Sequence, residues 1–418
     1  MAKEGSFYRL FRPLMPNSQP SRLRRALDAV GRAATATVRG TTYLARAGQA
    51  HQHFFLPVLN GALGDQLAAR GDARAITMSF RRAGRDVPVA ELGLTELRQK
   101  TLVFVHGLMG DELIWQTGFQ DADAHRRYGP RLVQEAGVRC LYVRFNSGLH
   151  LSENGQAFQQ LLTELLSAYP EQIGELVLVG HSMGGLVIRS AGYYASSYEL
   201  GVMSYELAEG AADNFKNQAE ALEIKKEEDN QPPIPAQNTE PSTHNSKLLT
   251  HNSNWLPHLR AIVLLGTPND GSWLEQNSHF TARLLDRINL FPTRFLSRAL
   301  NQRSNGIKDL RHSILVEADW RDPHADDLLP PRTPVPLLPG VAYHVLLGSW
   351  LKTGLPSALR QYFGDGLVGR RSALGGAAFA DEANLPPGTT VRLAEFARQH
   401  HGGLLTHPEV LHYLKARV

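Results

Sequence analysis

A serine in the middle of the chain stands where its hydroxyl could become a nucleophile. Ser182 is the centre of the run Gly180-His181-Ser182-Met183-Gly184. Apolar residues 176–179 precede this run and residues 186–188 follow it, which predicts a strand, a sharp turn and a helix. A turn tight enough to lift a hydroxyl clear of a sheet edge leaves no room for Cβ atoms around it, which explains the glycines. The pattern predicts a nucleophile elbow with Ser182 at a helix N-terminus.

Such a serine needs a base to take its proton and a carboxylate to orient that base. In proteins with an elbow of this kind, the three catalytic residues follow one another along the chain in the order serine, acid, histidine. Asp365 lies between two glycines in a loop that follows the strand predicted over 343–347, and it is the expected acid. Asp270 also follows a predicted strand and is the alternative.

The base should come after the acid, and four histidines do: His400, His401, His407 and His412. The first two occupy the loop after the last predicted strand, over 389–393, and such a loop can reach the serine. His412 falls on the closing helix, over 408–416, and should face away. We expect His401 to be the base, with His407 and His400 as alternatives.

Charge that develops on the substrate oxygen calls for two backbone N–H donors. Met183, directly after the nucleophile, is expected to supply one of them. The second is expected from Leu108, in the loop over 106–110 that follows the strand predicted over 101–105. Gly107 and Gly110 in this loop would let the backbone approach a substrate.

Apolar runs predict the elements that hold these loops. Strands are expected over 75–80, 101–105, 138–145, 176–179, 259–265, 343–347 and 389–393, and a helix over 152–168, capped by Ser152 or Glu153. Continuous apolar strands that alternate with helices are typical of a parallel sheet covered on both faces. The expected fold class is therefore α/β.

Two segments interrupt this alternation. Residues 196–258 are charged or rich in Pro, Asn, Thr and Gln, which predicts a flexible polar insertion. Residues 273–338 lie between two late strands, so they are expected to overlie the carboxyl edge of the sheet as a cap or lid.

The positive charge of the chain is concentrated near its N-terminus. The formal net charge is +4, but residues 1–100 hold 16 Lys/Arg against 7 Asp/Glu, a balance of +9, which leaves −5 for the remainder. Residues 22–47 place apolar residues at helical spacing and arginines on the other faces, which predicts a basic amphipathic helix. It would either pack on the catalytic domain or lie on an anionic lipid surface. We divide the chain into a basic helical extension, 1–74, and a catalytic domain, 75–418.

Composition excludes several classes of protein. The arginines come without aromatic interleaving or a nucleic-acid motif, so nucleic acid is not an expected partner. The single cysteine, Cys140, excludes an intramolecular disulfide and lies in an apolar run typical of a buried structural thiol. No signal peptide or transmembrane helix is recognisable, which favours a cytoplasmic protein with peripheral membrane contact at most.

Together these motifs resemble the α/β-hydrolase superfamily of serine esterases and lipases. Within it they are similar to a lipase-like group that includes GPI inositol-deacylases and bacterial esterase/lipase proteins. The likeness covers residue 101 to the C-terminus without the polar insertion, and rests on the strings Phe104-Val-His-Gly-Leu, Arg144-Phe-Asn-Ser-Gly-Leu-His, Gly180-His-Ser-Met-Gly-Gly, Gly266-Thr-Pro, Gly364-Asp-Gly-Leu-Val and His401-Gly-Gly-Leu-Leu-Thr-His-Pro. The Asn269-Asp270 pair departs from the group, which often has His or Arg there.

The resemblance implies an α/β-hydrolase fold that acts on an acyl ester or lipid without a metal or organic cofactor. Ser182 would be the nucleophile, Asp365 the acid and His401 the base. The same triad could transfer the acyl group to an alcohol other than water. An inactive, membrane-associated scaffold is the alternative from another class of protein.

Overall fold

The computed structural model describes residues 56–116, 127–197, 255–271, 304–325, 332–349, 370–373 and 384–417, with a few single positions between them. Several sequence expectations fall outside these residues. They are the basic helix over 22–47, nearly all of the polar insertion, the cap residues 273–303, and Asp365.

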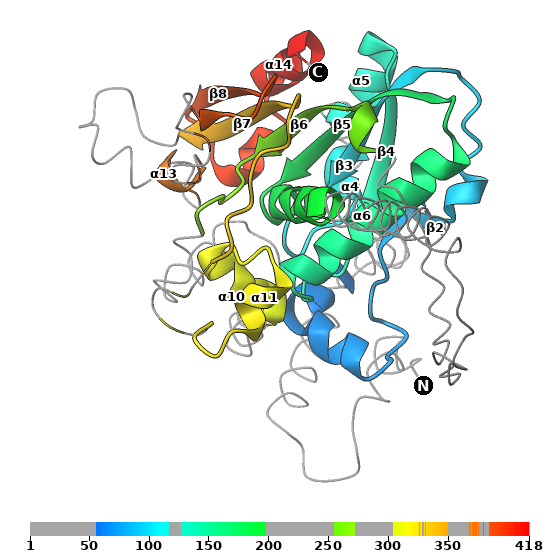
Figure 1. Ribbon diagram of the computed structural model, residues 1–418. Coiled ribbons are helices and arrows are strands. Elements are labelled where there is room, and N and C mark those ends of the chain that lie inside the picture. The colour runs from blue at the N-terminus through cyan, green and yellow to red at the C-terminus, as the bar shows by residue number, and fades with distance from the viewer. Residues whose placement is uncertain are drawn as a thin grey trace, which may run out of the picture.

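An eight-stranded sheet runs through the structure in the order β2-β1-β4-β3-β5-β6-β7-β8 (Figure 1). The strands are β1 Ser79–Arg82, β2 Arg85–Val87, β3 Gln99–Val105, β4 Arg139–Arg144, β5 Ile173–His181, β6 Leu259–Leu265, β7 Ala342–Ser349 and β8 Thr390–Ala397. Strands β3 to β8 pair in parallel, whereas β1 and β2 form an antiparallel hairpin at the edge beside β4. A mostly parallel sheet with its sharp serine turn after the central strand β5 confirms the α/β-hydrolase fold.

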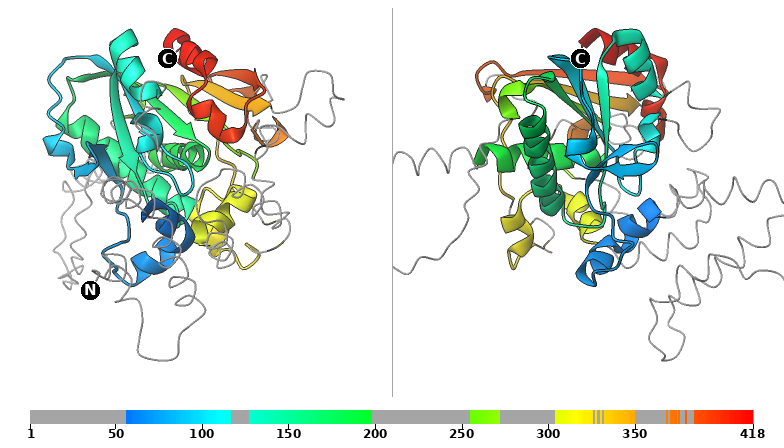
Figure 2. Two further views of the ribbon diagram at one scale, coloured as in Figure 1. Left: turned by 180° about the vertical axis from the view of Figure 1, so that it is seen from behind. Right: turned by 90° about the vertical axis from the view of Figure 1, so that its right-hand side faces the viewer.

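Helices cover both faces of this sheet, as Figure 2 shows from the side. They are α4 Leu113–Gln116, α5 Tyr128–Ala136, α6 Leu151–Ala168, α10 Asn305–His312, α11 Glu317–Arg321, α13 Arg370–Ala373 and α14 Pro408–Arg417, with helices also over 56–69 and 183–197. Val103 and Val105 of β3 pack in one apolar core with α6 and the helix over 183–197. Leu102 and Phe104 pack in a second core with α5 and α14. The continuous apolar runs are therefore explained by strands buried on both faces.

The helix α6 begins one residue earlier than expected, and neither Ser152 nor Glu153 is its N-cap residue. His150 is the N-cap residue, and its N–H donates to the Glu153 carboxylate at 2.8 Å. The Leu151 N–H donates to Asp309 of α10 at 2.8 Å, so a residue far along the chain also satisfies this helix end. The first strand was also predicted too early, because residues 75–78 precede β1 without being part of it.

The helix over 56–69 was not predicted, yet it is firmly packed. Its Val58, Leu59, Ala62, Leu63 and Leu67 are buried. Asn60, also buried, donates to the carbonyl oxygens of Leu56 and Arg74 at 2.9 Å and accepts from the Ile76 N–H at 2.8 Å. These bonds tie the helix to the segment that leads into the sheet.

Cys140 lies on β4 as a half-buried free thiol. Burial raises its pKa to about 12, as expected of a structural rather than a reactive cysteine. Among the described helices none is long and apolar enough to cross a bilayer.

Candidate active site

The turn after β5 has the geometry of a nucleophile elbow. Ser182 has a φ of 53°, a left-handed conformation that is rare outside glycine. Its N–H donates to the Leu265 carbonyl of β6 at 2.8 Å, and the helix over 183–197 starts directly after it. A Cβ on Gly184 would lie 2.4 Å from the Val105 and His106 carbonyl oxygens, so only glycine permits this close approach. Ser182 itself is partly exposed, so its hydroxyl is accessible.

The 106–110 loop lies directly beside Ser182, because β3 and β5 are neighbours. A Cβ on Gly107 would be 3.1 Å from the Ser182 Cβ. Met109 has a φ of 58°, and its N–H donates to the Ser147 Oγ at 3.0 Å. In contrast, the Leu108 and Met183 N–H groups donate to no acceptor within the described part of the chain. The structure thus sets the loop that holds Leu108 against the turn that precedes Met183.

His106 fixes the backbone at the start of this loop. Its Nδ1 donates to the Gly107 carbonyl at 2.8 Å, and its Nε2 accepts from the Phe145 N–H at 3.1 Å. The two bonds require the neutral tautomer with the proton on Nδ1. Burial lowers the pKa of His106 to about 4, which keeps the ring neutral. This role was missed from the sequence, where the histidine was seen only as part of the loop.

A buried ion network anchors the chain just beyond the loop. The Glu112 carboxylate, fully buried, accepts from Arg81 Nε at 3.0 Å and from Arg144 Nε and Nη2 at 2.9 and 3.0 Å. Removing one partner of such a network leaves an uncompensated buried charge, which is strongly destabilising. The sequence signal that could have predicted this network is the presence of charged residues within or beside apolar strands, since a buried charge must find a partner.

Asp111, between the loop and Glu112, should make stability depend on pH. Its Oδ2 is buried without a hydrogen-bond partner in the described chain, and burial, followed by the charge of Glu112, raises its pKa from 3.8 to about 7. The folded state therefore holds this proton more tightly, and the stability it contributes is present below pH 4 and lost as pH rises through about 7.

We expect Asp111→Asn to remove this pH dependence. Relative to the wild type, the variant should gain up to about 4 kcal/mol in the free energy of unfolding between pH 4 and pH 8. Urea titrations at both pH values measure the difference. Glu164→Gln, on the exposed face of α6, is the control; equal pH profiles for the wild type and Asp111→Asn would contradict the assignment.

The helix over 56–69 supports the other side of the 106–110 loop. A Cβ on Gly61 would lie 2.3 Å from the Met109 Cγ and 3.2 Å from the Ser147 Oγ. The Gly61 carbonyl accepts from the Ser304 hydroxyl at 2.7 Å, which joins the helix to the N-terminus of α10.

Gly61→Ala should therefore push Met109 out of place. We expect a loss of about 1–3 kcal/mol in stability from overpacking, and a lower turnover with esters because Leu108 adjoins Met109. Urea titration and ester hydrolysis measure the two effects. Ala68→Ser, at an exposed position of the same helix, should change neither, and an unaltered Gly61→Ala protein would show that the contact is unimportant.

Among the candidate bases, the structure places His401 beside the elbow. Its carbonyl lies 3.4 Å from the Nε2 of His181, and the two rings are 4.6 Å apart between centroids. The ring of His181 is buried, and burial followed by the neighbouring His401 holds its pKa well below the ordinary value. His401 starts the short helix η7, His401–Leu405, which carries the chain from the end of β8 back towards β5.

The two alternative bases are engaged elsewhere. The Nδ1 of His400 accepts from the Gly403 N–H at 3.0 Å, which caps η7. The ring of His407 packs against Phe396 of β8, with centroids 5.8 Å apart. Its Nδ1 is buried and has no partner in the part of the chain that the structure describes.

Of the two candidate acids, Asp365 lies outside the described residues. Asp270, the alternative, accepts from Arg332 Nη2 at 3.2 Å, and its N–H donates to the Ser372 carbonyl at 3.0 Å. Its carboxylate is thus paired with an arginine of the segment that leads into β7.

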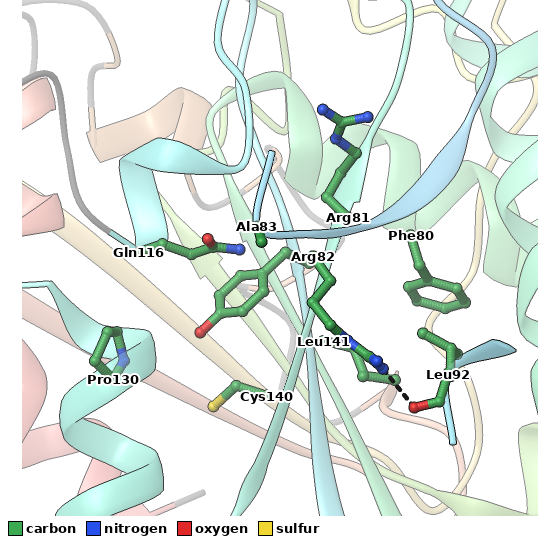
Figure 3. A pocket seen from close by; sticks show the side chains of 10 residues that line it. Phe80, Arg81, Arg82, Ala83, Leu92, Gln116, Pro130, Cys140 and Leu141 are labelled. Carbon is green, nitrogen blue, oxygen red and sulfur yellow. Dashed lines mark hydrogen bonds between the residues drawn. The ribbon is translucent and has the colours of Figure 1, made fainter. Parts of the chain in front are cut away.

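Neither of the two best-defined cavities is lined by Ser182 or His401. One, of about 290 Å³, lies at the β1–β4 edge and is shown in Figure 3, with Phe80, Leu92 and Leu141 on its wall. The other, of about 240 Å³, lies beside the helix over 183–197. The described residues contain no cluster of His, Cys, Asp and Glu that could hold a metal ion.

No protein-family model and no curated protein matches the chain. Among solved structures it is similar to the mature lipase BlEst2 of Bacillus licheniformis, with a TM-score of 0.38 and 15% identity over 81% of this chain and 98% of that one. Lipase B of Aspergillus fumigatus gives 0.37 and 9% over 80% of this chain and 54% of that one. An esterase of Pyrobaculum calidifontis gives 0.35 and 10% over 77% and 75%. Likenesses this distant leave the function to be drawn from the site geometry.

Proposed function

We propose that this protein is a serine hydrolase of carboxylic esters. The observation that carries the proposal is the strained Ser182 at the start of a helix, with the 106–110 loop beside it and His401 packed on the ring of its neighbour His181. A strained serine turn of this kind presents its hydroxyl above the sheet edge. The acceptor-free N–H groups of Leu108 and Met183 would then face the developing charge.

The proposed reaction proceeds through an acyl-enzyme. His401 takes the Ser182 proton as the hydroxyl oxygen attacks the ester carbonyl, and the Leu108 and Met183 N–H groups hold the oxyanion. His401 then gives its proton to the leaving alcohol, and afterwards activates the water that releases the acid. Asp365 is the proposed acid that keeps the imidazole in its working tautomer.

We propose a lipid acyl ester as the substrate, on the strength of the motifs shared with the lipase-like group that includes GPI inositol-deacylases. The basic helix over 22–47 would then bring the enzyme to an anionic lipid surface. Hydrolysis of p-nitrophenyl esters from short to long acyl chains tests the substrate class. A preference for long chains supports a lipase, whereas a short-chain preference points to an esterase of small substrates.

Covalent labelling tests the reaction class directly. A fluorophosphonate probe should label the wild type on Ser182, as peptide mapping by mass spectrometry would show, because it mimics the tetrahedral intermediate. An unlabelled protein that is also inert towards every ester in the series would contradict the proposal and favour an inactive scaffold.

A pair of variants tests which aspartate is the acid of the triad. Asp365→Asn should lower kcat by about 10⁴-fold, since loss of the orienting carboxylate leaves the imidazole in the wrong tautomer. Steady-state hydrolysis of a p-nitrophenyl ester measures the loss, with Asp381→Asn as a control outside the triad. A large loss in Asp270→Asn instead would show that the acid was assigned to the wrong residue.

A further inference from the structure

A second polar site lies along the helix over 183–197, which follows Ser182. The cavity of about 240 Å³ is bounded by the helix over 183–197, by the loop after β6 and by the segment that enters β7. Two guanidinium groups line it, those of Arg189 and Arg332. Arg189 is seven residues after Ser182, which is roughly 10 Å along a helix axis.

Arg189 is buried, yet in the described chain it makes no ion pair of its own. Only 8% of the residue is exposed. Its Nη1 donates to the carbonyl and side-chain oxygens of Asn269, and its Nη2 to the Val335 carbonyl, all at 3.3 Å and all to neutral acceptors. The Phe379 ring lies 5.3 Å from the guanidinium carbon. Burial lowers the pKa of Arg189 only to about 10, so the group stays charged at neutral pH.

The charges on the cavity wall do not balance. Arg332, which is exposed, donates through Nη2 to the Asp270 carboxylate at 3.2 Å and through Nη1 to the His312 carbonyl at 2.8 Å. Among the described residues, Asp270 is therefore the one carboxylate on a wall that carries two guanidinium groups. The nearby Asp319 does not line the cavity and is engaged by the N–H and hydroxyl of Thr333. Counted over these described residues, the wall carries one more positive charge than negative charges.

We infer that this cavity binds a phosphate group. The long hydrogen bonds of Arg189 are weak, so a charged oxygen would be a better acceptor than the carbonyls it now contacts. Guanidinium groups match phosphate oxygens in geometry as well as in charge, and burial strengthens the pairing. The phosphate would supply the compensating negative charge that Arg189 lacks in the described chain. The cavity also leaves room for an organic group attached to the phosphate.

Binding of inorganic phosphate to the full-length protein tests this site without any assay of activity. Calorimetric titration should detect binding in phosphate but not in sodium chloride of equal ionic strength. Arg332→Gln should weaken binding about tenfold by removing one charge-assisted partner. Asp270→Asn should strengthen it several-fold, because it removes the competing carboxylate.

A heat seen in phosphate alone, and changed by both substitutions, identifies this cavity as the binding site, because chloride of equal ionic strength screens distant charges to the same extent. Equal heats in phosphate and chloride would overturn the inference, and so would phosphate affinities that are the same in both variants and the wild type. Arg189→Gln should abolish binding if it folds. If it does not, the substitutions of the exposed Arg332 and the half-buried Asp270 carry the test.

A kinetic experiment, which rests on the proposed function, separates the two sources of phosphate. If the phosphate belongs to a lipid headgroup, inorganic phosphate should compete with an ester that carries a phosphate on its alcohol and should spare a neutral p-nitrophenyl ester. If the site takes free phosphate, neither ester is displaced. Both results are consistent with a phosphate site in this cavity. If the protein hydrolyses no ester, the proposed function is wrong, but the calorimetric test of the site is unaffected.

Discussion

Replacing Ser182 by alanine is expected to lower kcat/KM for an acyl ester by about 10⁴- to 10⁶-fold, with little change in stability. The hydroxyl oxygen is the atom that would form the acyl-enzyme, so no other group on the elbow can substitute for it. In the described chain the hydroxyl makes no hydrogen bond that holds the fold, since the recorded bonds of Ser182 are made by its backbone. Steady-state hydrolysis of a p-nitrophenyl ester and urea titration measure the two quantities.

Ser196→Ala provides the matched control. Ser196 lies on the helix over 183–197, and its hydroxyl donates to the Tyr193 carbonyl at 3.0 Å. The substitution therefore removes a serine hydroxyl that is away from the elbow. Its kcat/KM should stay within about twofold of the wild type. If Ser182→Ala keeps wild-type activity, the ester hydrolysis comes from another site and the proposed reaction is wrong.

The parts of the fold that could be predicted are those whose signals are local. Strand β6 has the predicted bounds, Leu259–Leu265, because six of its seven residues are apolar and buried, and only Arg260 is exposed. The elbow was equally readable, since its glycines are required by contacts within a few residues and across to the adjacent strand. Short-range patterns of this kind survive folding unchanged.

The edge hairpin shows why other parts could not be read. β1 contains Arg81, and a buried arginine argues against a strand unless its partner is known. That partner, Glu112, lies 31 residues further along the chain. The hairpin thus depends on a pairing that no short window of sequence displays.

The helix over 56–69 makes the same point about the site. Pro57 and Asn60 read as interruptions of an apolar stretch, but Asn60 satisfies three backbone groups once the helix is docked. The docking also sets Gly61 against Met109. The two N–H groups were proposed as donors from motifs, whereas the packing that holds the 106–110 loop in place could be seen only in three dimensions.

His401→Ala is expected to lower kcat/KM by about 10⁴-fold or more, because His401 is the proposed base that takes the Ser182 proton. The expectation rests on position: η7 carries His401 to within 4.6 Å of the His181 ring, next in sequence to Ser182. His400→Ala and His407→Ala are the matched controls from the same loop region, measured by the same ester assay.

The two controls should differ from His401→Ala in kind. His400→Ala removes a side-chain cap from the Gly403 N–H, which also donates to the His400 carbonyl, so it should cost only about 0.5–1 kcal/mol of stability. His407→Ala removes a ring packed on Phe396 and should cost about 1–3 kcal/mol. Both should lower stability more than activity. Loss of the base should slow the chemical step and leave the free energy of unfolding unchanged. Urea titration and the ester assay, made on the same variants, measure the two quantities. If His400→Ala or His407→Ala shows the catalytic loss at unchanged stability, that histidine is the base, and the loop after β8 must rearrange to bring it to Ser182.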